Sequence, residues 1–278
     1  MVAGLAEEMR SGIVITVFST ASAVGKTLVS INLAAELARL GYRVCLADLD
    51  IQFGDVCNYL QLAPEKTLYD AQKALKDDME QFTPLPYLTK YTHGDVSFSV
   101  LPAPMELDEA YNIVPENVKY ILEQLQTHFD YLVLDTTATF SGMNLLLMDL
   151  STIITFLGIV DFIPTIKNMK IGCDMLRQIG FEQTRFHLVL NRSNSKTRIE
   201  LADVEQLLEI PFYHVLPNNF TSAIDSIHTG VPLVLADPLD DLGDSLRRLV
   251  AKYTNRTAEK ADNKTGLGSW FKSLFDKG

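Results

Sequence analysis

The sequence predicts an α/β fold with a doubly wound, mostly parallel sheet. Apolar runs rich in β-branched residues alternate with segments of helical periodicity throughout residues 12–253. Such alternation is typical of consecutive βαβ units, whose sheet is covered by helices on both faces. Because the 278 residues show no internal repeat and no clear boundary before residue 254, we expect one large domain.

The first predicted βαβ unit is the clearest. Residues 13–19 (IVITVFS) are β-branched and mostly apolar, as in a strand that is buried on both faces. Apolar residues then recur at helical spacing: Val29, Leu33, Leu37 and Leu40. Gly41 follows as a C-cap glycine, and residues 43–50 (RVCLADLD) form the next strand, which ends in two acids.

The later elements continue the alternation. Further strands are predicted at residues 96–104, 131–138, 152–160, 185–192 and 212–217, and helices at 115–129, 165–179 and 239–253. Residues 145–160 are the most apolar stretch, but Asp149 interrupts them, which favours a helix followed by a buried strand over a membrane span. Two prolines and mixed polarity at residues 77–95 predict an excursion over the surface.

The composition excludes several classes of function. The 24 Lys and Arg against 35 Asp and Glu give a net charge of −11, which argues against broad nucleic-acid binding. The three cysteines have no CxxC spacing, which fits a reducing cytoplasm and argues against a zinc or disulfide framework. The five histidines form no HExxH motif, no serine lies in GxSxG, and residues 1–11 form a leader without a secretory signal.

Residues 19–30 (STASAVGKTLVS) lie between the first predicted strand and the first predicted helix. They end like a phosphate-binding loop, in which backbone N–H groups and a helix N-terminus hold phosphate oxygens. Gly25 lets the backbone approach phosphate, Lys26 supplies charge and Thr27 supplies a hydroxyl ligand for Mg²⁺. The alternative is a purely structural turn, since a tripeptide such as GKT recurs by chance.

The loop, together with residues 48–55 (DLDIQFGD) and 131–140 (YLVLDTTATF), resembles the MinD/ParA class of deviant Walker A ATPases. Within that class the chain looks closest to the CpaE/TadZ-type proteins of Flp/Tad (type IV-like) pilus assembly, over residues 12–253. The most specific stretch is residues 50–71 (DIQFGDVCNYLQLAPEKTLYDA). The resemblance implies a P-loop NTPase fold, bound ATP or ADP with Mg²⁺, a homodimer, pilus-assembly partners and a place in the bacterial cytoplasm, at the inner membrane face or a cell pole. Members of this family often carry a receiver-like domain ahead of this one, so we expect the chain to be a fragment or a short form.

The resemblance also implies roles for individual residues. The nucleotide-binding loop comprises Ala23, Val24, Gly25, Lys26, Thr27 and Leu28. Asp50 orients the attacking water and Asp48 supports the loop and the metal, although both could be solvated acids at a strand end. Asp135 holds the Mg²⁺ shell through water, and its alternative role is to cap the segment that follows it. Asn191 and the pair Pro217 and Asn218 hold adenine, although an asparagine at a strand end is by default a turn former.

The loop departs from the family pattern KGGVGKT, because Ala21, Ser22 and Ala23 stand in place of its first lysine and two glycines. In the family that lysine reaches across a dimer interface to the partner's nucleotide, and Ala21 cannot do so. We therefore expect ATP binding with slow or absent hydrolysis, at most of ATP to ADP and phosphate. Two alternatives stay open: a nucleotide-free scaffold of the same fold, and a ParA-like partitioning ATPase, which the acidic charge disfavours.

The end of the chain departs from the α/β pattern. Residues 254–265 (TNRTAEKADNKT) contain no large apolar residue and predict a flexible tether. Residues 266–278 then predict an amphipathic helix with one apolar stripe: Leu267, Trp270, Phe271, Leu274 and Phe275. That stripe could contact a membrane, a partner protein or the parent domain. MinD-like proteins end in short membrane-targeting helices, which favours peripheral membrane contact.

Overall fold

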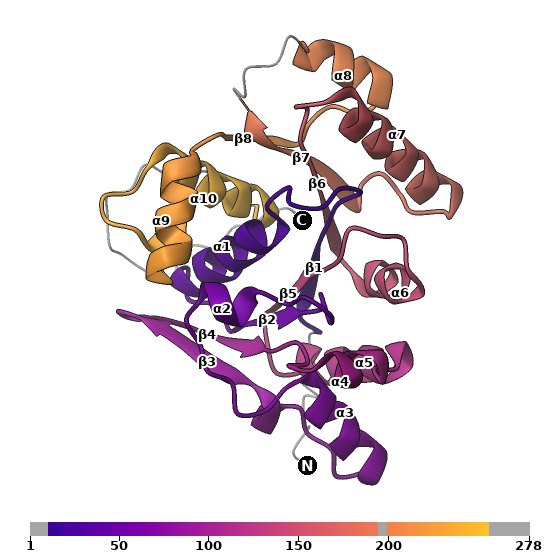
Figure 1. The fold of residues 1–278 in the computed structure, drawn as a ribbon, viewed down its shortest axis with the longest axis vertical. Helices are drawn as coiled ribbons and strands as arrows, with labels where there is room; N and C mark the ends of the chain where they lie inside the picture. The colour runs from indigo at the N-terminus through magenta and orange to yellow at the C-terminus, as the bar shows by residue number, and fades with distance from the viewer. Residues whose placement is uncertain (1–10, 194–198, 256–278) are drawn as a thin grey trace, which may run out of the picture.

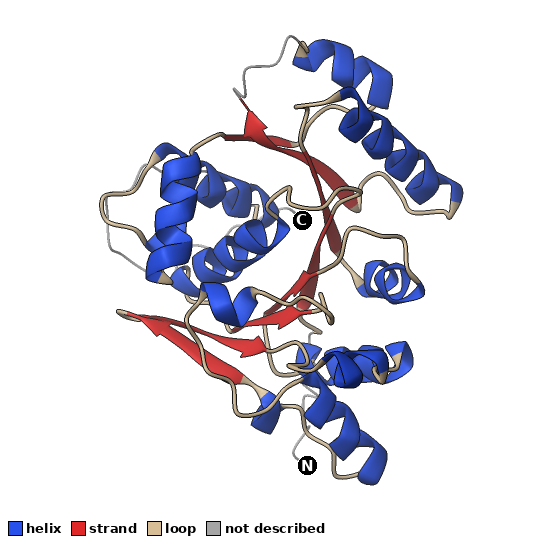
Figure 2. Ribbon diagram, viewed as in Figure 1, coloured by secondary structure: helices blue, strands red, loops and turns tan. Residues whose placement is uncertain are grey.

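The computed structural model describes residues 11–193 and 199–255, in which one eight-stranded sheet lies between two layers of helices (Figures 1 and 2). The strands are β1 (Ile13–Phe18), β2 (Val44–Asp48), β3 (Thr89–His93), β4 (Val96–Leu101), β5 (Tyr131–Asp135), β6 (Ile153–Gly158), β7 (Phe186–Ser193) and β8 (His214–Pro217). Their order across the sheet is β3-β4-β2-β5-β1-β6-β7-β8. Only β3 runs antiparallel to its neighbour, and every other pair is parallel.

Helices cover both faces of this sheet. One face carries α1 (Lys26–Arg39), α2 (Val56–Tyr59), α9 (Phe220–Thr229), the short η2 (Leu233–Leu235) and α10 (Asp241–Tyr253) (Figure 1). The other carries α3 (Leu68–Asp77), α4 (Leu107–Tyr111), α5 (Pro115–Gln126), α6 (Gly142–Leu150), α7 (Ile163–Gln178) and α8 (Leu201–Leu208), while the short η1 (Leu85–Tyr87) precedes β3. The doubly wound α/β architecture predicted from the sequence is therefore confirmed.

β1 is the centre of the core because it is buried on both faces. Ile15 and Val17 pack with α1 and α10, whereas Val14 and Phe18 pack with the helices of the opposite face. This two-sided burial is what its continuous β-branched sequence predicts. All parallel strands end at one edge of the sheet, so the loops that follow β1 and its neighbours meet there.

The structure differs from the prediction in one strand that was missed and in where several elements end, for instance at Leu101 and Asp135 in place of residues 104 and 138. Residues 77–95 contain β3 and not only a surface excursion. In this antiparallel edge strand only Tyr91 is buried, so the segment lacks the apolar run that marks the other strands. The strand predicted at residues 43–50 ends at Asp48, and Asp50 lies beyond it.

Three further predictions fall wholly or largely outside the described residues. They are the leader, of which the structure describes Ser11 alone, the tether, of which it describes Thr254 and Asn255, and the apolar stripe of residues 266–278. Among the helices that the structure does describe, none is long and apolar enough to cross a membrane.

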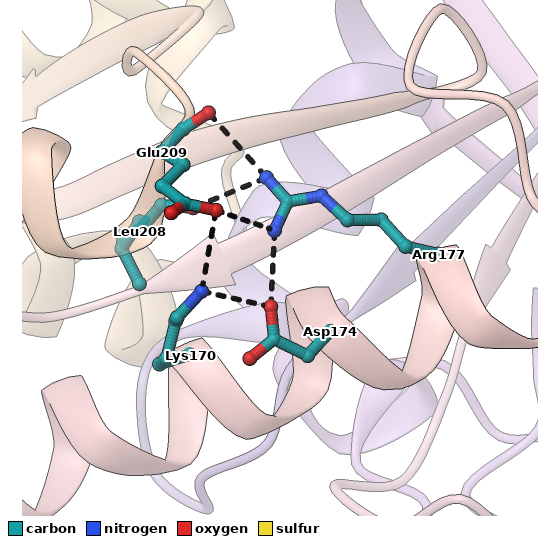
Figure 3. Close-up of polar contacts among 5 residues, drawn as sticks. All are labelled: Lys170, Asp174, Arg177, Leu208 and Glu209. Carbon is teal, nitrogen blue, oxygen red and sulfur yellow. Dashed lines mark hydrogen bonds and ion pairs between the residues drawn. The ribbon is translucent and has the colours of Figure 1, made fainter.

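Ion pairs and hydrogen bonds of charged side chains connect the end of α8 to α7 (Figure 3). Lys170 Nζ lies 2.9 Å from Asp174 Oδ1 and 3.6 Å from a carboxylate oxygen of Glu209. The Arg177 guanidinium donates to Asp174 at 3.0 Å and to the carbonyl oxygens of Leu208 and Glu209 at 3.1 and 3.4 Å. Since the last carbonyls of a helix have no partner within it, Arg177 fixes the end of α8 in place.

α7 packs closely on Thr20 and Phe156 at Gly172. A Cβ atom at this position would lie 2.6 Å from Thr20 Cγ2 and 2.8 Å from Phe156 Cζ. Thr20 follows β1, so α7 packs directly on the first turn of the loop between β1 and α1. The close contact leaves no room for a side chain on α7 at this point.

Gly172→Ala is expected to lower the free energy of unfolding by about 1–3 kcal/mol, because the added methyl group overpacks this contact. Urea unfolding followed by circular dichroism measures it. Gly142→Ala is the matched control, because a Cβ there would meet nothing within 4 Å and alanine favours the helix. Equal stability of the two variants would contradict the proposed packing constraint.

Candidate functional site

A cavity of about 1060 Å³ opens at the carboxyl edge of the sheet. Its lining comes from segments at or after the C-terminal ends of β1, β2, β5, β7 and β8. In open parallel α/β sheets ligands bind at this edge, where the order of the strands reverses. Here the chain runs from β1 to β2 in one direction and from β5 to β6 in the other, so the reversal lies at the neighbouring strands β1 and β5.

The loop between β1 and α1 forms the floor of the cavity. Gly25 is the N-cap of α1 and has a left-handed backbone with φ +93°. As a glycine, this N-cap residue has no side chain with which to cap the helix, and the first turn of α1 contains no acidic residue. The first N–H groups of a helix lack partners within the helix and carry its positive dipole, so they suit an anion such as phosphate.

The structure brings most of the predicted loop residues to this cavity. Ala23, Gly25, Lys26, Thr27 and Leu28 line it, together with Ser22, whereas Val24 is fully buried in the core. The side chain of Val24 therefore does not line the cavity. A Cβ at position 25 would lie 2.7 Å from Asn191 Nδ2, so this position accepts only glycine on both steric and backbone grounds.

Asp135 lies directly beside Thr27. The Ser30 hydroxyl donates a hydrogen bond to its carboxylate at 2.9 Å. Burial raises the pKa of Asp135 to about 6, while hydrogen bonding from Thr27 and Ser30 and the charge of Lys26 act to lower it. Hydroxyl and carboxylate oxygens are the ligands that Mg²⁺ prefers, so the residues present fit this metal.

Ser30 was not predicted from the sequence. It follows Thr27 at i+3, a spacing that places two residues on the same face of a helix, and this signal was available.

The two acids after β2 have different surroundings. Asp48 is 2% exposed and accepts hydrogen bonds from the N–H groups of Asp50 and Val56 at 3.3 and 3.1 Å. Burial, followed by the charge of Asp135, raises the pKa of Asp48 above its ordinary value. Asp50 lines the cavity instead. Since β2 ends at Asp48, Asp50 lies in the loop that follows the strand and does not belong to the strand itself.

Residues at the ends of β7 and β8 form the opposite side of the cavity. Asn191, Pro217 and Asn218 all line it, as predicted, and their contact with adenine stays a prediction. Next to them the lining is apolar, suited to a planar base: Phe220, Ala223, Ile224, Ile227 and Leu242. Arg192 also lines the cavity, and neither it nor the apolar residues were predicted from the sequence.

Comparison with known families matches residues 15–229 to the CobQ/CobB/MinD/ParA nucleotide-binding domain. The chain belongs to this family. It is 25% identical over 230 residues to the septum site-determining protein MinD of Thermotoga maritima, covering 81% of this chain and 82% of that protein.

Solved structures of the MinD/ParA family share the fold. A ParA family ATPase of Chlorobium tepidum has a TM-score of 0.78 at 17% identity, covering 86% of this chain and 99% of that one. MinD of Pyrococcus horikoshii, solved in complex with Mg-ADP, has a TM-score of 0.74 at 18% identity, covering 87% and 96%. The P-loop NTPase fold predicted for this MinD/ParA relative is therefore confirmed.

We predict that the two acids of this MinD/ParA-family site differ in their effect on stability. Asp48→Ala leaves the N–H groups of Asp50 and Val56 buried without an acceptor and should lower the free energy of unfolding by about 1–3 kcal/mol. Asp50→Ala removes a carboxylate that faces the cavity, and should change it by less than about 0.5 kcal/mol. Chemical unfolding of both variants compares them, and an effect of Asp50→Ala as large as that of Asp48→Ala would reject this division of roles.

Proposed function

We propose that this protein is an ATP·Mg²⁺-binding localisation or assembly factor of the MinD/ParA superfamily that serves Flp/Tad pilus biogenesis. The observation that carries nucleotide binding is the uncapped N-terminus of α1, which faces a cavity together with Lys26 and Thr27. The pilus role is supported by the resemblance of residues 50–71 to CpaE/TadZ-type proteins.

In this proposal the N–H groups at the start of α1 bind phosphate oxygens, and Lys26 neutralises their charge. Thr27 would hold Mg²⁺ directly and Asp135 would hold it through water. When bound, the metal would withdraw charge from the terminal phosphates. Asp50, whose carboxylate faces the cavity, orients a water molecule. Asp48 acts indirectly, by fixing the backbone of residues 50–56 from which Asp50 projects.

Slow or absent hydrolysis is part of the proposal. Ala21 stands where the family pattern KGGVGKT has its first lysine. Its side chain packs against the core, and its N–H group donates to Ser19 Oγ at 3.1 Å. A methyl group in this place supplies no charge to a nucleotide across a dimer interface. We therefore expect the chain to bind ATP while hydrolysing it slowly or not at all.

A homodimer that meets at the cavity edge fits the exposed surface. Large apolar side chains follow the C-terminal ends of β2, β6 and β8 and are exposed: Phe53, Phe162, Ile163 and Phe220. Exposed apolar groups gathered around a site are typical of an interaction surface. A second copy placed across this edge would cover them and enclose the nucleotide.

Lys26→Ala should weaken binding of ATP·Mg²⁺ by about 10- to 100-fold, because it removes a charged hydrogen-bond donor to phosphate. Isothermal titration measures the affinity, and light scattering with and without ATP measures dimerisation. Phosphate release by the unmodified chain should barely exceed that of Lys26→Ala.

Lys119→Ala is the matched control, since Lys119 lies on α5 and pairs with Glu123 at 3.8 Å. If the unmodified chain binds no nucleotide, the scaffold alternative takes the place of this proposal. Retardation of non-specific DNA at physiological salt would instead support partitioning, against the net charge of −11.

For the tail, we propose peripheral contact with the inner membrane face through the apolar stripe of residues 266–278, in the bacterial cytoplasm. Its two lysines, Lys272 and Lys277, give only weak attraction to anionic lipid, so a dimer would add avidity. Anionic liposomes should therefore pellet the full chain more than a chain ending at Tyr253. Equal pelleting would reject a membrane role.

A further inference from the structure

Two neighbouring residues at the end of β7 hold two successive carbonyl groups of the phosphate-binding loop. Asn191 Nδ2 donates to the Val24 carbonyl oxygen at 2.8 Å, and Arg192 Nη2 donates to the Ala23 carbonyl oxygen at 2.8 Å. These contacts join segments 167 and 169 residues apart in the chain. Two side chains at the end of β7 therefore hydrogen-bond the backbone of the phosphate-binding loop.

A β-bulge lets both neighbours reach the loop. In a regular strand adjacent side chains point to opposite faces. Here Leu190 pairs with Val215 and Ser193 with Pro217, so β7 has one residue more than β8 between these pairs. Arg192 occupies the extra position with a left-handed φ of +54°, and its N–H group donates to Asn191 Oδ1 at 2.9 Å. A bulge of this kind redirects a side chain beside a functional site.

The loop needs this support at Ala23. Its φ is +56°, in the left-handed region that glycine enters freely and alanine enters only against steric repulsion. The family pattern has a glycine at this place. Ala23 is exposed to solvent, so no packing from above fixes it, and the hydrogen bond from Arg192 to its carbonyl is the described contact that does.

We propose that Arg192 is a positioning residue that holds Ala23 in the left-handed conformation and thereby keeps the phosphate-binding loop in its binding shape. A glycine at position 23 would adopt the left-handed conformation without such a contact, because it has no Cβ atom. The inference rests on the proposed nucleotide binding for its affinity readout, whereas its stability readout is independent of any ligand.

The test is a double-mutant cycle with Ala23→Gly. Arg192→Ala should weaken ATP·Mg²⁺ binding about tenfold, the size expected for one lost hydrogen bond in a preorganised site. Ala23→Gly removes the need for support, so Arg192→Ala in the Ala23→Gly background should cost less than about threefold. If Arg192 contacts the nucleotide itself, the loss stays about tenfold in both backgrounds, and the proposal is overturned.

The ligand-free protein gives the second readout. Arg192→Ala should lower the thermal midpoint by about 2–4 °C, and in the Ala23→Gly background by clearly less. If Arg192→Ala lowers the thermal midpoint equally in both backgrounds, the proposal is overturned. This result is independent of nucleotide binding, whose absence would reject the proposed function and leave this test intact.

Arg185→Ala is the matched control. Arg185 Nη2 also donates to backbone carbonyls, those of Met148, Asp149 and Ser151, at the other edge of the sheet. It should lower the thermal midpoint equally in both backgrounds and leave nucleotide affinity unchanged. Rescue of Arg185→Ala by Ala23→Gly would show that the rescue is not specific to Arg192.

Discussion

The start of α1 sets the constraint on which the rest of this site depends. A helix end carries N–H groups that the helix itself does not satisfy, and here the N-cap residue is a glycine and the first turn contains no acid that could accept from them. The helix cannot shift to relieve this, because residues 29–37 are buried against the sheet. The fold therefore holds a set of aligned donors at the floor of a cavity, and an anion is the group that completes them.

The buried carboxylates impose a second constraint beside the first. Asp48 and Asp135 lie opposite each other in the register of β2 and β5, and burial raises the pKa of both. Hydrogen-bond donors offset the cost of burying this pair: the N–H groups of residues 50 and 56 donate to Asp48, and the Ser30 hydroxyl donates to Asp135. Asp48 therefore holds backbone, whereas Asp135 lies beside the hydroxyl-bearing first turn of α1.

The elements that local periodicity defines could be predicted from the sequence. The contacts between residues far apart in the chain could not. The strands buried on both faces and the helix after the loop follow from β-branched runs and helical spacing alone. β3 was missed because a solvent-facing edge strand needs only one buried residue, Tyr91. Arg192 was missed because its function is defined by a carbonyl 169 residues away and by a bulge, neither of which leaves a pattern in neighbouring residues.

Some loop residues match the family pattern KGGVGKT and others depart from it. The two groups differ in whether another part of the molecule can do the work of the original residue. Gly25 is irreplaceable, because its φ of +93° and the 2.7 Å approach of Asn191 both exclude a side chain. Lys26 and Thr27, which line the cavity, are the groups that the proposed function assigns to phosphate and metal. Ala23 instead tolerates the loss of glycine, because its strained backbone is held through its carbonyl by a neighbouring strand. A loop can therefore lose most of its glycines and retain the geometry that binds phosphate, provided that side chains outside it hold the backbone in that shape.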